Sequence, residues 1–289
     1  MTSTAETQER AFAFLSLNER PSKPRSRGVT EIRGPYYTPL GRRQLGDVLE
    51  TMGVYVDTLK YAGGSFALMP REAVRDLNEL CHEHDVEVST GGFLEYVLTQ
   101  RGDAVANYLA ECRELGFDIV EISSGFVTLP VEDLGALTKA VGKAGLKAKP
   151  EVGIQFGAGG ASSVEVLDAE GTRDVGQAIE LAKRHLDGGA HMLMIESEGI
   201  TEQVREWRTD VVARIVAELG LEQVMFEAAD PDVFTWYVKN YGIDVNLFVD
   251  HSQIVQLECL RAGIWGTQDT WGRMLSYGPR SSDEESPEP

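Results

Sequence analysis

The sequence predicts an α/β protein built as a (β/α)8 TIM barrel, and three observations support this fold class. Eight short runs rich in β-branched and apolar residues alternate with amphipathic helical segments along the chain. Glycines close the helical segments, at the place where a helix commonly ends in a left-handed residue. The length of 289 residues suits one barrel of about 250 residues with short extensions.

The predicted strands follow one another without a break in composition. They are expected at residues 28–33, 55–61, 86–90, 118–123, 146–152, 191–196, 223–228 and 244–249. Strands that alternate with helices form parallel sheets through right-handed crossovers. No GxGxxG pattern follows the first strand, which disfavours an open dinucleotide-binding sheet. The sequence therefore favours a closed barrel over residues 28–272.

The helical segments repeat apolar residues at steps of three and four. The clearest stripe consists of Val105, Tyr108, Leu109, Cys112 and Leu115. Helix-ending glycines are expected at Gly116, Gly145, Gly188, Gly189, Gly220, Gly242 and Gly263. Residues 156–174, after the fifth strand, are rich in glycine and serine. We expect them to form a mobile loop over the face of the barrel that carries the chemistry.

The two ends of the chain differ in composition from the barrel. Residues 1–27 are predicted to form a short N-terminal arm, in which the basic run SKPRSR at 22–27 is a solvated segment leading into the first strand. Residues 273–289 are predicted to form a disordered acidic tail. The last nine residues carry four carboxylates and no apolar side chain, so they cannot join a packed core.

Charge and cysteine content limit the partners of the protein. Its formal net charge is −19, from 46 acidic and 27 basic residues, which disfavours binding to nucleic acid or to an anionic membrane. No apolar run reaches the roughly 18 residues of a membrane span, and the N-terminus lacks a secretory pattern. Three cysteines without a CxxC motif are typical of reduced thiols. We expect a cytoplasmic protein, and the sequence leaves open whether it forms a homo-oligomer.

Four consecutive predicted strands each carry a glutamate near the C-terminal end of an apolar run. These residues are Glu121, Glu151, Glu196 and Glu227, and Lys60 ends the second strand. Any one of them alone could be a structural ion pair, but several buried carboxylates repel one another unless a cation joins them. Active sites of such barrels lie at the strand C-termini. The pattern therefore predicts a Mg²⁺ site with Glu151, Glu196 and Glu227 as ligands and Glu121 nearby.

Two further segments at this face give weaker signals. His251, in the run DHSQ, could act as an acid or base, or could cap the loop together with Asp250. The run GGS at 63–65 could offer the backbone N–H groups of Gly64 and Ser65 to a phosphate. Both segments follow predicted strands, so both are expected at the same end of the barrel.

Several segments together resemble the phosphosulfolactate synthase family. In order along the chain they are KPRSRGVTEI, YVDTLKYAGGSFALMPRE, STGGFLEY, LAECRELGFDIVEISSG, KPEVG, HMLMIES, VMFEA and VNL. The resemblance covers roughly residues 22–272. The run NLFVDHSQIVQLECLR looks closer to the plant heat-stress-associated proteins and their fungal and bacterial relatives, which share the barrel.

The resemblance implies a magnesium-dependent (β/α)8 barrel that adds sulfite to phosphoenolpyruvate, on the route to coenzyme M. It assigns catalytic roles to Lys60, Glu121 and Ser123, and a substrate-binding role to Asn246 of VNL. Glu151, Glu196 and Glu227 match the glutamates of the family's EVG, IIE and FEA motifs. A small anionic substrate resembling phosphoenolpyruvate is the implied partner.

The chain departs from the family pattern where positive charge is expected. Arg33 stands in place of an aspartate that ends the first strand, and Ile154 and Gln155 stand where lysines usually follow EVG. An arginine expected after Glu196 is missing from ESEG. We expect Arg33 to bind substrate in place of a lost cation. The identity of the nucleophile stays open, and so does the alternative of a non-catalytic barrel that binds partners under stress.

Overall fold

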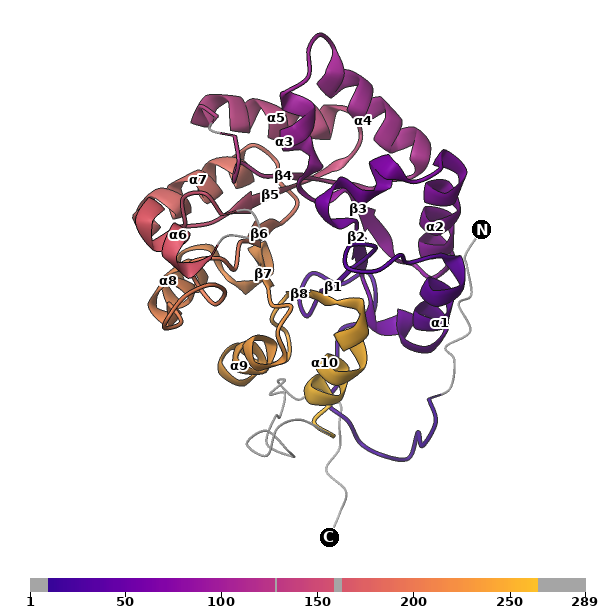
Figure 1. Cartoon of the computed structure of the whole chain (residues 1–289). Coiled ribbons are helices and arrows are strands. Elements are labelled where there is room, and N and C mark those ends of the chain that lie inside the picture. The colour runs from indigo at the N-terminus through magenta and orange to yellow at the C-terminus, as the bar shows by residue number, and fades with distance from the viewer. Residues whose placement is uncertain (1–9, 128, 159–162, 265–289) are drawn as a thin grey trace.

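The predicted fold is confirmed by a computed structural model that describes residues 10–127, 129–158 and 163–264 of the chain. Eight parallel strands form one closed barrel in sequence order, and helices surround it (Figure 1). Closure joins the first strand to the last, because Ile32 lies in register with both Leu59 and Val249.

The strands are shorter than predicted but lie at the predicted places. They are β1 (Thr30–Arg33), β2 (Thr58–Lys60), β3 (Glu87–Ser89), β4 (Ile119–Ile122), β5 (Lys147–Val152), β6 (Leu193–Ile195), β7 (Val224–Glu227) and β8 (Leu247–Asp250). The second run loses its first residues because Gly53–Tyr55 forms a 3₁₀ turn before β2. Strands buried on both faces carry continuous apolar runs, and this explains why the sequence marked them clearly.

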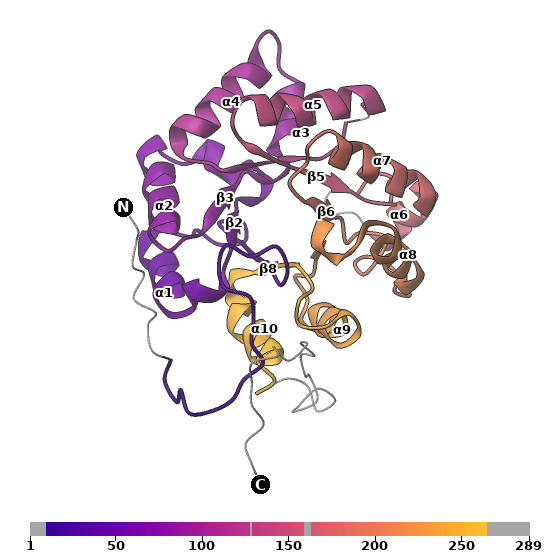
Figure 2. The ribbon, with the colours of Figure 1, turned by 180° about the vertical axis from the view of Figure 1, so that it is seen from behind.

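The helices form the outer ring of the barrel (Figures 1 and 2). They are α1 (Arg42–Met52), α2 (Arg71–Glu83), α3 (Leu94–Leu98), α4 (Ala104–Leu115), α5 (Val131–Lys143), α6 (Val164–Glu170), α7 (Val175–Asp187), α8 (Thr209–Leu219), α9 (Pro231–Tyr241) and α10 (Ile254–Arg261). Helix α4 buries Leu109, Cys112 and Leu115 of the predicted stripe, and it ends at Gly116 with φ of 84°.

The segment after β5 is more ordered than predicted. Instead of one continuous loop it contains helix α6, whose first turn is capped by the Ser163 hydroxyl accepting the Val166 N–H. Gln155 donates from its side chain to the carbonyl oxygens of Leu167 and Gly171, at 2.9 Å in each case. A short helix with its own cap and anchor replaces the expected loop over Val164–Glu170, while the expected mobility stays a prediction.

Apolar packing inside the barrel lies mainly towards the N-terminal ends of the strands, and only Phe248 of a small cluster reaches the charged side chains, 4.6 Å from Nζ of Lys60 to its ring centre. This small cluster consists of Val29, Met192, Met194, Met225 and Phe248, while the larger core lies between strands and helices. Met194 and Met225 stand two residues before Glu196 and Glu227, so each methionine and its glutamate share the inward face. The interior towards the C-terminal ends of the strands is therefore left mainly to charged side chains.

The ends of the chain are only partly described. The predicted tail, 273–289, and residues 265–272 of the predicted barrel lie outside the described residues. None of the described helices is long and apolar enough to cross a membrane.

Candidate active site

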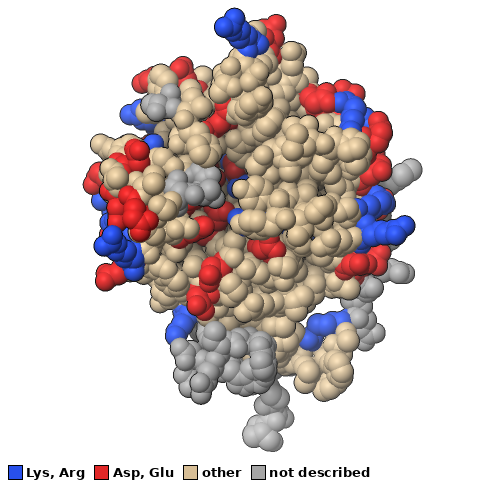
Figure 3. Space-filling model, viewed as in Figure 1, with Lys and Arg blue, Asp and Glu red and all other residues tan. Residues whose placement is uncertain are grey.

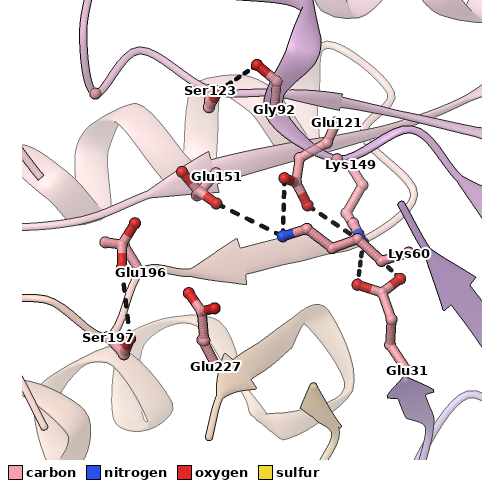
Figure 4. A network of polar contacts seen from close by, with 12 residues as sticks. Glu31, Lys60, Gly92, Glu121, Ser123, Lys149, Glu151, Glu196, Ser197 and Glu227 are labelled. Carbon is pink, nitrogen blue, oxygen red and sulfur yellow. Dashed lines mark hydrogen bonds and ion pairs between the residues drawn. The ribbon is translucent and has the colours of Figure 1, made fainter. Parts of the chain in front are cut away.

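Charged side chains gather in the central hollow at the C-terminal ends of the strands (Figure 3). Figure 4 shows how they converge from different strands. Lys60 of β2 is the central cation: its Nζ lies 2.9 Å from Oε1 of Glu121 and 3.9 Å from Oε2 of Glu151. The structure therefore brings together three of the residues that the sequence pattern selected.

A second lysine continues this network into the barrel. Lys149 of β5 donates to both carboxylate oxygens of Glu31, at 2.5 and 2.6 Å, and lies 3.3 Å from Oε2 of Glu121. The side chains of Lys149, Glu31 and Glu121 are at most 2% exposed. Positive and negative groups therefore alternate from Glu31 through Lys149 and Glu121 to Lys60.

The ionisation of this network follows from its pairing. Burial alone would raise the pKa of Glu121, but the ammonium groups of Lys60 and Lys149 hold it below its usual range. Burial would lower the pKa of Lys60, and the carboxylates of Glu121 and Glu151 more than reverse this. Glu121 and Lys60 are thus both charged at neutral pH.

The glutamates nearer the opening are less well compensated. Burial, with repulsion from Glu121, raises the pKa of Glu151 to about 8. Burial, with repulsion from Glu151 and Glu227, raises the pKa of Glu196 well above its usual range. Glu196 accepts one backbone N–H, from Glu198 at 3.0 Å. Both carboxylates therefore favour the protonated form more than an ordinary glutamate does, and an approaching cation would oppose this.

Arg33 is paired within the site. Its Nη2 lies 3.0 Å from Oε1 of Glu227, and its Nη1 donates to the Tyr37 hydroxyl at 3.0 Å. Its guanidinium also lies 5.0 Å from the ring centre of Phe248. The arginine thus neutralises Glu227 in this structure.

The inward-facing side chains of the strands include more acidic groups than basic ones. Five glutamates meet three cations there: Glu31, Glu121, Glu151, Glu196 and Glu227 against Arg33, Lys60 and Lys149. Full ionisation would leave two uncompensated negative charges. Each buried charge without a partner costs several kcal/mol, because the ion loses its hydration.

The three predicted metal ligands match Mg²⁺ in donor chemistry but not in their present placement. As the side chains stand, no group of three or more His, Cys, Asp or Glu residues within the described ranges is placed to hold a metal ion. The donor chemistry nevertheless fits, because Glu151, Glu196 and Glu227 present hard oxygen ligands from three neighbouring strands. Metal binding requires these carboxylates to move towards one another.

A cavity of about 850 Å³ opens beside the cluster and shares Arg33 and Glu227 with it. His251 also lines this cavity, and its Nδ1 lies 3.0 Å from the carbonyl oxygen of Arg33. Asp250 caps the following turn by accepting the Ser252 N–H, in a capping box with Gln253. The two roles considered for the DHSQ run are therefore divided: Asp250 caps the loop, while His251 faces the cavity.

Other predicted residues support the walls of the site. The Ser123 hydroxyl, on the loop after β4, lies 3.4 Å from the carbonyl oxygen of Gly92. Ser65 donates to the carbonyl oxygen of Pro35 at 2.7 Å, so its hydroxyl is used within the loop. Gly64 has φ of 67°, and a Cβ there would lie 2.1 Å from the Phe93 ring. The absence of a side chain at Gly64 is thus required by packing.

Asn246 does not lie at the site, which corrects the role implied by its motif. It directly precedes β8, is fully buried, and so lies at the N-terminal end of the barrel. Its side chain accepts the Val29 N–H at 2.9 Å and donates to the carbonyl oxygens of Leu221 and Val224. It holds backbone segments together at the end opposite to the glutamates.

Two glutamates of the site region were missed by the sequence reasoning. Glu31 lies in the first strand, where its alternation with Ile32 would have placed it on the inward face. Glu95 is buried in α3, and its carboxylate accepts the N–H groups of Gly125, Phe126 and Val127 at 2.7 to 3.1 Å. It thereby holds the loop after β4, and no local sequence pattern indicated that contact.

Known proteins similar to this chain indicate its family. The model of the (2R)-phospho-3-sulfolactate synthase (ComA) family matches residues 18–267. The Arabidopsis thaliana protein HEAT-STRESS-ASSOCIATED 32 is 39% identical over 259 residues, covering 86% of this chain and 91% of that protein. Phosphosulfolactate synthase of Methanothermobacter thermautotrophicus is 28% identical over 273 residues, covering 91% of this chain and 98% of that enzyme.

A solved structure shares the fold. The carboxyl transferase domain of Rhizobium etli pyruvate carboxylase with pyruvate superposes with a TM-score of 0.54 at 13% identity, covering 78% of this chain and 40% of that one. This likeness concerns the barrel alone, whereas the family match spans the strands that carry the glutamates. The chain belongs to the (2R)-phospho-3-sulfolactate synthase family.

Proposed function

We propose that the protein is a Mg²⁺-dependent lyase that adds a nucleophile, sulfite or a related one, to phosphoenolpyruvate. The observation that carries the proposal is the deficit of two positive charges among the inward-facing glutamates and cations of the strands. One divalent cation would balance it. When bound by Glu151, Glu196 and Glu227, Mg²⁺ would supply Lewis-acid stabilisation of the negative charge that develops on the substrate carboxylate.

Lys60 would contribute a fixed positive charge beside the reacting carboxylate. Its ion pair with Glu121 keeps the ammonium charged and positioned before substrate arrives. Such preorganised charge is usually the largest single contribution to catalysis of this type.

When the nucleophile adds to phosphoenolpyruvate, the carbon that carries the phosphate (C2) must receive a proton. The group that supplies it must be able to hold a proton before the reaction. The two lysine partners of Glu121 hold its pKa low, so we assign Glu121 to positioning Lys60 rather than to proton donation. His251, in the turn directly after β8, is the better candidate, because it lines the cavity that shares Arg33 and Glu227 with the cluster. Arg33 would meet the substrate only by exchanging its contact with Glu227.

A second function is favoured by a different observation. The identity to the heat-stress-associated plant protein is higher than to the synthase, and Gln155 is used to anchor α6 where the family pattern has a cation. A barrel that binds a partner under stress would not need to bind phosphoenolpyruvate.

The experiment that separates these functions follows phosphoenolpyruvate by phosphorus NMR, with Mg²⁺ and sulfite. We expect consumption that requires both additions and is abolished in Lys60→Met but kept in Lys147→Met, whose lysine is 43% exposed. If no phosphoenolpyruvate is consumed, and calorimetry shows that it does not bind in the presence of Mg²⁺, the synthase proposal is wrong. Binding and turnover with a different nucleophile would retain the site and change only the second substrate.

A further inference from the structure

The N-terminal arm inserts basic side chains into the end of the barrel opposite to the glutamates. The prediction that the run at 22–27 is solvated is wrong for Arg25, whose side chain is only 3% exposed. The side chain of Arg20, which precedes that run, is only 7% exposed. Figure 2, which shows the molecule from behind, has the indigo arm reaching the barrel beside α10. Asn18 fixes it there through a backbone hydrogen bond of 3.2 Å to the carbonyl oxygen of Ala262.

Lys23 anchors the middle of this arm. Its Nζ donates to the carbonyl oxygens of Gly53, His84 and Asp85, at 2.8 to 3.2 Å. These carbonyls follow the C-terminal ends of α1 and α2, where helix dipoles favour a cation. The three acceptors favour the charged form of the ammonium group.

The buried charges at this end do not balance. Four cations, Arg20, Lys23, Arg25 and Arg261, meet two buried carboxylates, Asp57 and Glu258. Two other acids lie nearby, but Asp85 is exposed and Asp244 pairs with the exposed Arg27. An excess of two positive charges therefore remains at this end, where Lys23 is half-buried and the side chains of the three arginines are at most 7% exposed.

Several donors in this cluster also lack acceptors. Nε of Arg20 and Nη1 of Arg25 are buried and have no hydrogen-bond partner among the described residues. Burial, with Arg25 contributing, lowers the pKa of Lys23 to about 8. Burial, with Arg20 contributing, lowers the pKa of the fully buried Arg261 to about 9. Both shifts express the cost of holding like charges together without a counterion.

We propose that the N-terminal end of the barrel binds a small inorganic anion between the arm and the barrel, with the unpartnered N–H groups of Arg20 and Arg25 as donors. Arginine presents several fixed N–H donors and stays charged, so it suits such a ligand. The anion would offset the excess positive charge of the cluster and stabilise the docked arm. The site is separate from the glutamate cluster and does not depend on the function proposed there.

The test compares the full-length protein with two variants of the arm. Arg25→Gln removes a proposed ligand, and Arg27→Gln removes an exposed arginine of the same arm, 56% exposed, as the matched control. Thermal unfolding is followed while chloride, sulfate or phosphate replaces gluconate at constant ionic strength. We expect a saturating rise in Tm for the parent and Arg27→Gln, with apparent affinity weakened about tenfold or more in Arg25→Gln, since each charge-assisted hydrogen bond contributes substantially.

Crystals of the parent protein grown in bromide provide a second measurement that does not depend on the variants. An anomalous peak within hydrogen-bonding distance of Nη1 of Arg25 supports the proposal. A uniform, non-saturating response in all three proteins, or crystals without a bromide peak at this cluster, overturns it. Which anion gives the tightest saturable response distinguishes a halide site from an oxyanion site.

Discussion

Replacing Lys149 with methionine should destabilise the barrel far more than replacing Lys147, two residues earlier on the same strand. Lys149 is 2% exposed and bonds both oxygens of Glu31, whose side chain is 1% exposed. Without it, Glu31 is left as a buried carboxylate lacking its nearest cation, and Glu121 also loses a partner. Breaking a buried pair in this way costs about 3 to 5 kcal/mol.

Lys147 provides the comparison because it has a similar ion pair at the surface. Its Nζ lies 2.5 Å from the carboxylate of Glu87, but the two side chains are 43% and 39% exposed. An exposed pair of this kind contributes roughly 0 to 1 kcal/mol. The two variants are thus expected to differ by about 3 kcal/mol, a large part of the roughly 5 to 15 kcal/mol that stabilises a typical protein.

Urea unfolding followed by circular dichroism measures both free energies of unfolding. Adding Glu31→Gln to Lys149→Met should recover part of the loss, because it removes the uncompensated charge while keeping the side-chain size. Equal losses in Lys147→Met and Lys149→Met would refute the reasoning. So would a double variant that is no more stable than Lys149→Met alone.

Three further outcomes are expected. The pKa of Glu151 is raised to about 8, so the folded metal-free protein binds this proton more tightly than the unfolded chain does. The resulting stabilisation of the folded state is complete below about pH 4 and is lost as the pH rises towards 8. The free energy of unfolding, measured with urea, should fall over that window by up to about 1.4 kcal/mol per pH unit from this group, and Glu151→Gln should reduce the slope. Glu196→Gln should weaken Mg²⁺ binding in calorimetry, and unchanged affinity would remove Glu196 from the ligand set. Glu95→Gln should speed amide exchange at Gly125 and Phe126 by about tenfold, since N–H bonds to a carboxylate are strong; protection equal to the parent's would contradict that role.

The sequence was most informative where its signal is local. Apolar runs alternating with helices predicted the barrel, because each strand buries both faces and each helix buries one. The strand glutamates and Lys60 could be placed at one end, since parallel strands all end at the same rim. The convergence of Lys60, Glu121 and Glu151 then follows from the fold.

Contacts between distant segments could not be predicted in the same way. Lys149 and Glu31 are 118 residues apart, and nothing near either residue indicates the other. The basic arm has the composition of a solvated segment, and Lys23 is bound by carbonyl groups that any sequence possesses. Asn246 was misplaced for a different reason: a motif match gives a residue type, whereas its position before β8 sets the end of the barrel at which it lies.

The methionines beneath the glutamates have a consequence for how the site tolerates change. Met192, Met194 and Met225 make up most of the small apolar cluster inside the barrel. Unbranched thioether side chains adapt to irregular spaces at little energetic cost. When the neighbouring carboxylates are drawn together by a cation or replaced during evolution, these methionine side chains can repack without moving the strands. The barrel can thus exchange the chemistry at its rim while its backbone stays the same.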